Sequence, residues 1–405
     1  MARAPDGVLP DTAIEKLIAD GHIRFSEIDD NWIQPASIDL PLSEEAYHVG
    51  KATSTIPVEK RISRGTRIDL SKPNVFQPNG AYLVRIDGTF DLPSNIRGYT
   101  NPKSTTGRTD ILARLLTEGQ ARYDHIPAGY QGSLWLEVRT QSFPIQLERG
   151  ITLSQLRFFQ GETSLDRNAL LSQRYGNPTL LFHRDGTPYQ PQEIVVDNLG
   201  TGSYGVVMHL DLEEGRKDLP RIDGKPIVGF RTRLDATRPI PFTQAVTPTE
   251  KLNPHDYFEP VFATDGELTV HPDFMYILST IQRFAVPPHL CSTLSIMDPS
   301  MGDFRAHYAG FFDPGFGWTA EGEAGLWKPV PELCIGTTAT LEVRVLDTEP
   351  QILTHGQPIC KALFDILQSL PAEPYRLQKP GGLLQQGNYG GQDGPYYGKH
   401  FKPWI

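Results

Sequence analysis

The chain has 405 residues, 39% of them hydrophobic, and a formal net charge of −10. This length favours two domains over one, because a single hydrophobic core rarely extends over so long a chain. The negative charge argues against a general nucleic-acid binder, since the sequence has no basic stripe able to release counterions from a phosphate backbone. Its 37 glycines and 35 prolines fall in clusters, which predicts short strands joined by many turns.

The three cysteines, Cys291, Cys334 and Cys360, include no C-x-x-C pair. We therefore expect neither a disulfide framework nor a classical structural zinc site. The first residues lack the basic-then-apolar layout of a signal peptide, and nowhere do eighteen apolar residues follow one another. These features predict a cytoplasmic protein with no membrane partner.

The first predicted element is a helix near the N-terminus, where Thr12 and Glu15 form a capping-box pattern around an apolar stripe of Ile14, Leu17 and Ile18. After it, alternating apolar and polar residues predict strands. In the first half these lie at residues 81–93, 132–140 and 149–159, and pieces of the same kind follow at 274–287, 311–318, 339–347 and 355–367.

The two halves carry the same parts in the same order. The sequence YLVRIDGTFDLPSNI from Tyr82 aligns without a gap with YILSTIQRFAVPPHL from Tyr276. Farther along, both halves contain the word LEVR, with Glu137 in the first and Glu342 in the second. An internal duplication of one β-rich domain explains this order.

We expect four parts: a first copy at 1–165, a connector at 166–195, a second copy at 196–370 and a tail at 371–405. The connector has weak periodicity and many turn residues. The tail is rich in glycine, tyrosine and glutamine, so it is not expected to build a core.

Two features of the first copy carry polar chemistry. Period-two alternation places Glu137 and Arg139 on one face of their strand, where the pattern alone predicts a solvated ion pair. Upstream, the stretch KSTTGR at 103–108 places Ser104 and Arg108 four residues apart, on one side of a helical turn. Such a turn is either an ordinary capped turn or a seat for a phosphate group or a bound water.

Several stretches resemble the dCTP deaminases: QPASIDL at 34–40, KSTTGR at 103–108, GYQGSLWLEV at 129–138 and, in the second half, DPGFGW with LEVR. The tail segments around Tyr375 and Gln392 resemble the family's C-terminal segment, which closes over the bound triphosphate. This family shares one superfamily of trimeric enzymes with the dUTPases. The resemblance implies a mainly β protein with two tandem dUTPase-like distorted β-barrel (β-clip) domains and few short helices.

The resemblance also implies hydrolytic deamination of dCTP to dUTP and ammonia, in pyrimidine deoxynucleotide metabolism. Water attacks C4 of cytosine, and one glutamate takes the water's proton and returns protons to the leaving ammonia. That glutamate matches Glu137 and Glu342. The family's serine that holds the attacking water matches Ser104, and the arginine that supports the charges at the site matches Arg108.

The triphosphate is expected at the KSTTGR turn, with Mg2+ bound through the triphosphate and not by protein ligands. No zinc is expected, because the sequence has neither an H-x-E motif nor a P-C-x-x-C motif. The substrate-binding positions that the resemblance implies are Lys103, Thr105, Ala309, Asp313, Tyr375 and Gln392.

Each copy departs from the family pattern. The first has HIPAG at 125–129 where the family has Asp-Pro-Gly, and the second has Asp313 in such a motif but lacks the arginine of the KSTTGR turn. Active sites in this superfamily form between subunits, so we expect a homo-oligomer with sites between barrel copies. In this hypothesis Ser104 and Arg108 work with Asp313 and Glu342, while Glu137 lies in a degenerate or a second working site.

Two other functions stay open. One is a dUTP diphosphatase, alone or combined with the deaminase, for which Asp313 is the carboxylate that the motif places. The other is a non-catalytic nucleotide-binding protein on the same duplicated barrel. The expected partners are dCTP and dUTP, and no nucleic-acid polymer.

Overall fold

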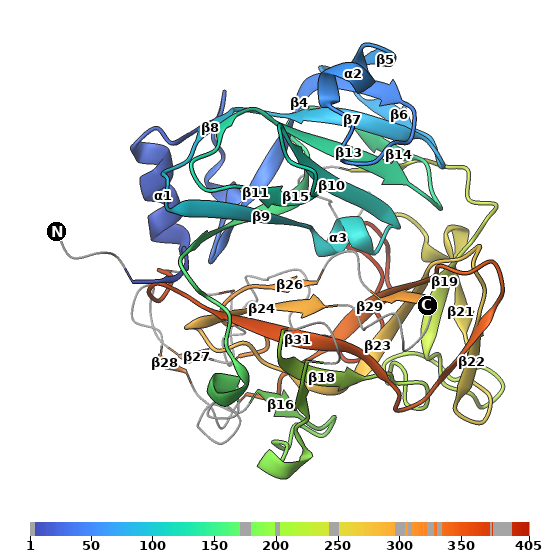
Figure 1. Cartoon of the computed structure of the whole chain (residues 1–405). Helices are drawn as coiled ribbons and strands as arrows, with labels where there is room; N and C mark the ends of the chain where they lie inside the picture. The colour runs from blue at the N-terminus through green and yellow to red at the C-terminus, as the bar shows by residue number, and fades with distance from the viewer. Residues whose placement is uncertain are drawn as a thin grey trace. The chain divides into compact units, whose positions relative to one another are not determined.

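The structure is a computed structural model that describes residues 5–170, 180–198, 203–242, 251–295, 304–306, 310–318, 320–321, 328–329, 334–372, 375 and 391–404. The chain divides into two compact units (Figure 1), and most regular elements of both are strands, as the sequence predicts. Unit 1 contains Met1–Thr163, Asp235–Pro254 and Gly398–Lys402, and unit 2 contains Ser164–Leu234, His255–Tyr397 and Pro403–Ile405. The sequence predicts a simple succession of copies, whereas here two later segments pack with the first unit.

Unit 1 contains three short helices, one 3-10 turn and sixteen strands in its described residues. In chain order they are β1 (Gly7–Val8), α1 (Asp11–Ala19), β2 (Ile23–Arg24), η1 (Asp30–Trp32), β3 (Ile33–Gln34), β4 (Ser37–Val49), α2 (Val58–Ile62), β5 (Thr66–Asp69), β6 (Asn74–Phe76), β7 (Ala81–Ile86), β8 (Thr89–Asp91), β9 (Ile96–Pro102), α3 (Ser104–Gly107), β10 (Ile111–Thr117), β11 (His125–Ile126), β12 (Gln131–Gly132), β13 (Leu134–Thr140), β14 (Ile145–Leu147), β15 (Thr152–Gln160) and β20 (Ile240–Pro241).

The largest sheet of unit 1 curls until its two ends meet. Its central order is β10-β13-β7-β4-β15-β9-β11. Asp124, just before β11, joins β9 to β10, because its carbonyl accepts a hydrogen bond from Thr100 N at 2.9 Å and its N–H donates to Leu115 O at 2.9 Å. The Asp124 carboxylate also accepts from Leu115 N at 2.8 Å. These bonds close the sheet into a barrel-like layer.

Helix α1 begins one residue before the predicted capping box. Pro10 is the N-cap, and Ala13 N and Ile14 N both donate to its carbonyl at 3.0 Å. Thr12 therefore lies inside the first turn, where its N–H donates to the Asp11 side chain at 2.7 Å. The capping-box prediction is wrong, because a proline with a fixed φ and no N–H begins the turn instead. The apolar stripe is confirmed, since Ile14 is fully buried.

Unit 2 is built from two larger sheets and two small ones in its described residues. The orders of the larger sheets are β21-β19-β23-β29-β25, with β16 beside β23, and β17-β18-β31-β24-β26. The elements are β16 (Leu181–Phe182), η2 (Pro191–Glu193), β17 (Val196–Asp197), β18 (Gly205–His209), β19 (Gly229–Thr232), η3 (Pro254–Asp256, whose first residue falls in unit 1), β21 (Phe258–Val261), β22 (Glu267–Val270), β23 (Tyr276–Phe284), β24 (Leu290–Ser295), β25 (Phe304–Ala306), β26 (Phe311–Phe312), β27 (Ala320–Glu321), β28 (Lys328–Pro329), β29 (Thr337–Val345), β30 (Gln351–Thr354) and β31 (Pro358–Ile366).

The predicted connector at 166–195 packs with unit 2. Leu170 and Leu180 are buried in its apolar core, and β16 pairs with β23 through Leu181 and Phe182. This stretch therefore contributes apolar side chains and hydrogen bonds to unit 2 in addition to linking the two copies.

The strand registers of the two units match residue by residue. Between β13 and β7, Glu137 lies opposite Leu83. Between β29 and β23, Glu342 lies opposite Ile277. Leu83 and Ile277 occupy the same column of the sequence alignment, so the two glutamates hold equivalent places in equivalent strand pairs.

A side-chain contact repeats as well. The Tyr82 hydroxyl accepts a hydrogen bond from Gln77 N at 2.8 Å, and the Tyr276 hydroxyl accepts from His271 N at 3.0 Å. The spacing along the chain is the same in both pairs. The internal duplication read from the sequence is thus also visible in the three-dimensional contacts.

The end of the chain contributes to the core of unit 2. Tyr397 and Trp404 are each 8% exposed, and their rings lie 5.2 and 5.0 Å from the ring of Phe230. The expectation that the tail builds no core is wrong here, because its aromatic residues are buried at its far end. None of the helices among the described residues has the length and apolarity needed to cross a membrane.

Candidate active site

Glu137 on β13 is the centre of a buried ion-pair cluster in unit 1. Its side chain is 2% exposed, and its Oε2 lies 2.5 Å from Nη2 of Arg61, which is equally buried. Its Oε1 pairs with Arg139. The Tyr123 hydroxyl donates to Oε2 at 3.3 Å, and burial raises the pKa of this tyrosine, with a smaller contribution from the Glu137 charge. The predicted ion pair exists, but the expectation that it is solvated is wrong.

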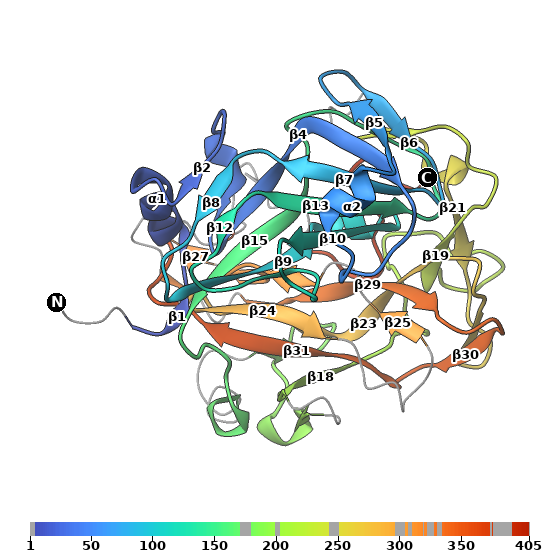
Figure 2. The ribbon, with the colours of Figure 1, turned by 45° about the horizontal axis from the view of Figure 1, so that its top comes forward.

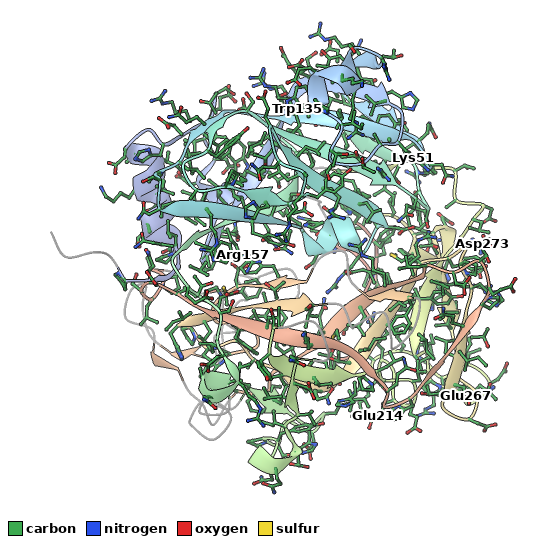
Figure 3. The ribbon with its side chains drawn as sticks, in the orientation of Figure 1. Lys51, Trp135, Arg157, Glu214, Glu267 and Asp273 are labelled. Atoms are coloured by element: carbon green, nitrogen blue, oxygen red, sulfur yellow. The ribbon has the colours of Figure 1, made fainter. Side chains whose placement is uncertain are left out.

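Helix α2 carries the Arg61 that pairs with Glu137, and Figure 2 shows this helix in front of β13. Its Val58 belongs to one apolar cluster with Leu83 of β7, and Ile62, Tyr123 and Trp135 pack against the same cluster. Trp135 is labelled in Figure 3. The face of β13 that carries Glu137 is therefore filled by the protein's own side chains. Sequence reasoning missed Arg61, because this residue lies on α2, an element distant along the chain from β13.

Glu342 on β29 of unit 2 has different neighbours on its strand face. It is 1% exposed, and because side chains alternate along a strand, Thr340 projects from the same face. Ser279 of β23 lies opposite Thr340 and so shares this face too. Leu278 and Leu341 project from the other face into the apolar core.

Equivalent positions in the two copies differ in size. The alignment that places Tyr82 over Tyr276 places Arg85 over Ser279, and the common LEVR word places Trp135 over Thr340. The first copy thus carries two bulky side chains where the second carries two small hydroxyl residues. The strand-face neighbours of Glu342 are therefore smaller than those of Glu137.

The Asp-Pro-Gly loop of unit 2 contacts one predicted tail residue. Tyr375 N donates to Pro314 O at 2.7 Å, and the Tyr375 ring lies 5.5 Å from that of Phe316. Asp313 is 8% exposed, and its carbonyl accepts from Phe316 N at 3.1 Å. Tyr375 and Asp313 therefore belong to one packed corner of unit 2. The predicted Ala309 lies outside the described residues.

The KSTTGR stretch forms the helical turn α3 in unit 1. Arg108 N donates to Ser104 O at 3.0 Å, so the two residues lie one turn apart as their spacing predicts. Ser104 is half-buried, whereas Thr105 and Arg108 are 7% and 5% exposed. The hydroxyl of Ser104 makes no hydrogen bond within the described part of the chain.

A charged cluster borders this turn. The Lys103 ammonium donates to the Asp39 carboxylate and, at 2.9 Å, to the Thr152 hydroxyl. Burial raises the pKa of Asp39, although Lys103 opposes this shift. Gly398 packs against the turn, and burial followed by repulsion from Lys103 lowers the pKa of the next residue, Lys399. Sequence reasoning missed Asp39 and Lys399, although Asp39 lies in the quoted QPASIDL stretch.

The predicted tail residue Gln392 lies in unit 2 with 9% exposure, and its carbonyl accepts from Thr338 N at 3.2 Å. The next residue, Asp393, pairs with Arg184 at 2.9 Å and with Arg283 at 3.4 Å. The tail is thus anchored at this point by backbone bonds and by two arginines.

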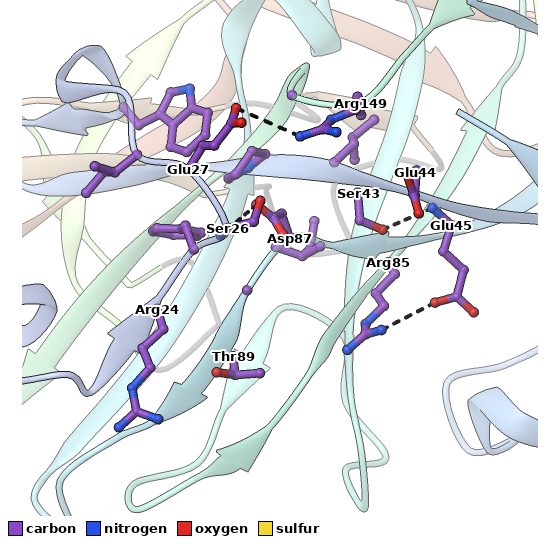
Figure 4. Close-up of a pocket in the computed structure, with 18 of the residues that line it drawn as sticks. Arg24, Ser26, Glu27, Ser43, Glu44, Glu45, Arg85, Asp87, Thr89 and Arg149 are labelled. Atoms are coloured by element: carbon purple, nitrogen blue, oxygen red, sulfur yellow. Dashed lines mark hydrogen bonds and ion pairs between the residues drawn. The ribbon is translucent and has the colours of Figure 1, made fainter. Parts of the chain in front are cut away.

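A separate cavity of about 850 Å³ lies in unit 1 (Figure 4). It is lined by charges of both signs, including the Arg85–Glu45 pair at 3.4 Å and Asp87, which accepts from the Ser26 hydroxyl at 2.5 Å. The predicted site residues are not among those that line it. Across the described residues, no three His, Cys, Asp or Glu side chains group so that they could hold a metal ion.

The fold and these motifs define a duplicated, mainly β nucleotide enzyme. The family model of the 2'-deoxycytidine 5'-triphosphate deaminase N-terminal domain matches residues 5–162, and that of the C-terminal domain matches residues 188–401. The chain belongs to the dCTP deaminase family. The fold is correspondingly dUTPase-like, as predicted.

Known relatives are of two lengths. The crystal structure of 2'-deoxycytidine 5'-triphosphate deaminase from Agrobacterium tumefaciens superposes with a TM-score of 0.74 at 30% identity, over 91% of this chain and 100% of that one. A dCTP deaminase, dUMP-forming, from Beutenbergia cavernae is 27% identical over 46% of this chain and 90% of its own. A dCTP deaminase from Natronomonas pharaonis is 25% identical over 40% and 84%. These two relatives match less than half of the chain, as expected for a tandem form.

Proposed function

We propose that the protein deaminates dCTP by hydrolysis and that Glu342 is its general base and acid. The observation that carries this assignment is the contrast between the two buried glutamates. Two arginines and Tyr123 bind the carboxylate of Glu137. Glu342 shares its strand face with the small side chains of Ser279 and Thr340, at the positions where Glu137 has Arg85 and Trp135. We assign to Glu137 a structural role in unit 1.

In the proposed reaction, Glu342 takes a proton from a water while the water's oxygen bonds to C4 of cytosine. The same carboxyl group then returns the proton to the amino nitrogen, the C4–N bond breaks, and ammonia leaves. One group can do both tasks in a buried site, because desolvation brings the free energies of its charged and neutral forms closer together.

The other predicted residues keep the roles that the family resemblance implies. Ser104 and Arg108 support the water and the charges of the reaction, and the turn with Lys103 and Thr105 binds the triphosphate. Mg2+ is proposed to enter with the triphosphate and to offset its charge. Tyr375 and Gln392 are proposed to contact the nucleotide from the tail, and Ala309 and Asp313 from the second copy.

The decisive experiment compares Glu342→Gln with the paired variant Glu137→Gln/Arg61→Met, in an assay for ammonia release from dCTP. We expect Glu342→Gln to lose about a thousandfold or more in kcat, because both proton transfers depend on this carboxylate. The paired variant should keep activity within a few-fold. If Glu342→Gln keeps full activity, the assignment is wrong.

The alternative product of the same site is dUMP, because several relatives are named dUMP-forming dCTP deaminases. Incubation with dCTP followed by separation of dUTP, dUMP and pyrophosphate identifies the product. If dUMP forms, Asp313→Asn should lower dUMP formation more than ammonia release, so that dUTP accumulates, because Asp313 is the carboxylate proposed to direct water at the α-phosphate.

We also propose that the protein is a homo-oligomer, as the family resemblance implies, and that it is cytoplasmic, as its sequence features predict. Light scattering of the purified chain measures its oligomeric state. Mixing inactive Glu342→Gln and Arg108→Ala proteins tests whether the two residues act from different chains, because recovery of ammonia release requires subunits that complement each other.

A further inference from the structure

Two buried hydroxyl groups flank Glu342 in unit 2. Ser279 is 0% exposed and Thr340 is 5% exposed. They are Cα partners across β23 and β29, and Glu342 follows Thr340 on the same face of β29. Side chains opposite one another in such a pair have Cβ atoms about 4.5–5.5 Å apart, so the hydroxyl groups of two short side chains can both reach one water that lies over the pair.

Both hydroxyl groups are without a hydrogen-bond partner among the residues that the structure describes. A buried polar group left in this state costs roughly 1–3 kcal/mol, so such groups normally have a partner. The neighbouring Thr280 follows this rule, since its hydroxyl donates to Gln282 O at 2.8 Å and accepts from Ala339 N at 3.0 Å. Ser279 and Thr340 are therefore exceptions within a well-bonded strand pair.

The strand pair is irregular at this point. The pairing of β23 with β29 shifts register between Ser279 and Arg283. Bulges of this kind often lie beside active sites, where they redirect a side chain or end the pairing. The irregularity begins directly after Ser279, the residue opposite Thr340.

We propose that Ser279 and Thr340 hold the water that Glu342 activates. Buried waters make two to four hydrogen bonds, so these two hydroxyls and the Glu342 carboxylate can bind one water together with the Ser104 hydroxyl already proposed to support it. The oxygen of this water forms the new bond to C4, the C4–N bond breaks, and the proton taken by Glu342 leaves with ammonia. The inference rests on the proposed function and adds two positioning residues to it.

The test measures kcat and KM for dCTP together with thermal unfolding of the full chain. Thr340→Val and Ser279→Ala should each lower kcat about tenfold to a hundredfold, because a displaced nucleophile loses much of the advantage of orientation. KM should stay within about twofold, because the two hydroxyls are proposed to bind the water and not dCTP. Thr340→Ser, which keeps the hydroxyl, should restore most of kcat.

Stability separates this role from a structural one. Thr340→Val should unfold at the same temperature as the wild type or higher, because valine removes a buried hydroxyl that the protein leaves unbonded. Thr293→Val is the matched control, since the Thr293 hydroxyl on β24 is also buried and unbonded among the described residues. It should leave kcat unchanged.

Wild-type kcat in both Thr340→Val and Ser279→Ala would overturn the inference, and so would a loss of kcat that Thr340→Ser does not restore. If Thr340→Val fails to fold, Ser279→Ala decides in the same way. A wild-type chain that releases no ammonia from dCTP would instead refute the proposed function, so the two failures are distinguishable.

Discussion

Replacing Glu137 by glutamine should destabilise unit 1 strongly. The change removes the negative charge that two arginines share while keeping the size and much of the hydrogen-bonding capacity of the side chain. Arg61 is the more affected partner, because its side chain is only 2% exposed and solvent cannot replace the lost carboxylate. Arg139 is 28% exposed and can be hydrated.

The size of the effect follows from this burial. Removing one partner of a buried ion pair leaves an uncompensated charge and costs about 3–5 kcal/mol. Replacing both partners by groups without charge is often neutral, so Glu137→Gln/Arg61→Met should recover most of the loss. The coupling free energy between the two positions is then about 3 kcal/mol or more.

Urea unfolding of the single and double variants measures these free energies. The matched control is the Glu45–Arg85 pair, also in unit 1, whose side chains are 28% and 40% exposed and whose contact is 3.4 Å. Glu45→Gln should cost at most about 1 kcal/mol, because exposed pairs contribute little. The reasoning fails if Glu137→Gln is no more destabilising than Glu45→Gln, or if Arg61→Met does not compensate it.

Two further predictions concern pH and metal. Burial lowers the pKa of His400 to about 3. An unfolded histidine has a pKa near 6.5, so between pH 6.5 and pH 3 only the unfolded chain binds this proton. As far as His400 is concerned, protein stability is therefore highest above pH 6.5 and decreases as the pH falls through this range. Wild-type stability should therefore decrease by about 2 kcal/mol more than that of His400→Phe between pH 7 and pH 5, and parallel pH profiles in urea would contradict the assignment. For the metal, EDTA should weaken dCTP turnover, added Mg2+ should restore it, and a zinc-selective chelator should have no effect. Full activity in EDTA would rule out the proposed part of Mg2+ in substrate binding.

Much of the fold is readable from the sequence. Period-two alternation predicts the strand with Glu137, and the repeated LEVR word predicts its equivalent with Glu342. These patterns are local, and a strand that buries one face fixes its own register. The predicted helix start at Thr12 is wrong for a local reason, because Pro10, two residues earlier, is the N-cap.

The side chains that surround Glu137 and Glu342 can be identified only from the tertiary structure. An alternating pattern shows that Glu137 and Arg139 share a strand face, but it cannot show that α2 brings Arg61 over that face. It also cannot show that two unbonded hydroxyls lie beside Glu342. Burial and ion pairing depend on segments distant in the chain, so the same LEVR sequence has different neighbouring side chains in the two units.

The duplication, the β-rich class and the family can be predicted from the amino-acid sequence, because they depend on the order and spacing of residues. Only the folded structure shows that two arginines bind Glu137 and that Ser279 and Thr340 share the strand face of Glu342. It also places the chain's end, since the rings of Tyr397 and Trp404 pack against Phe230 of β19, far earlier in the sequence. Contacts between distant segments determine how deeply each charged side chain is buried, and that burial affects its ion pairing and its capacity for proton transfer.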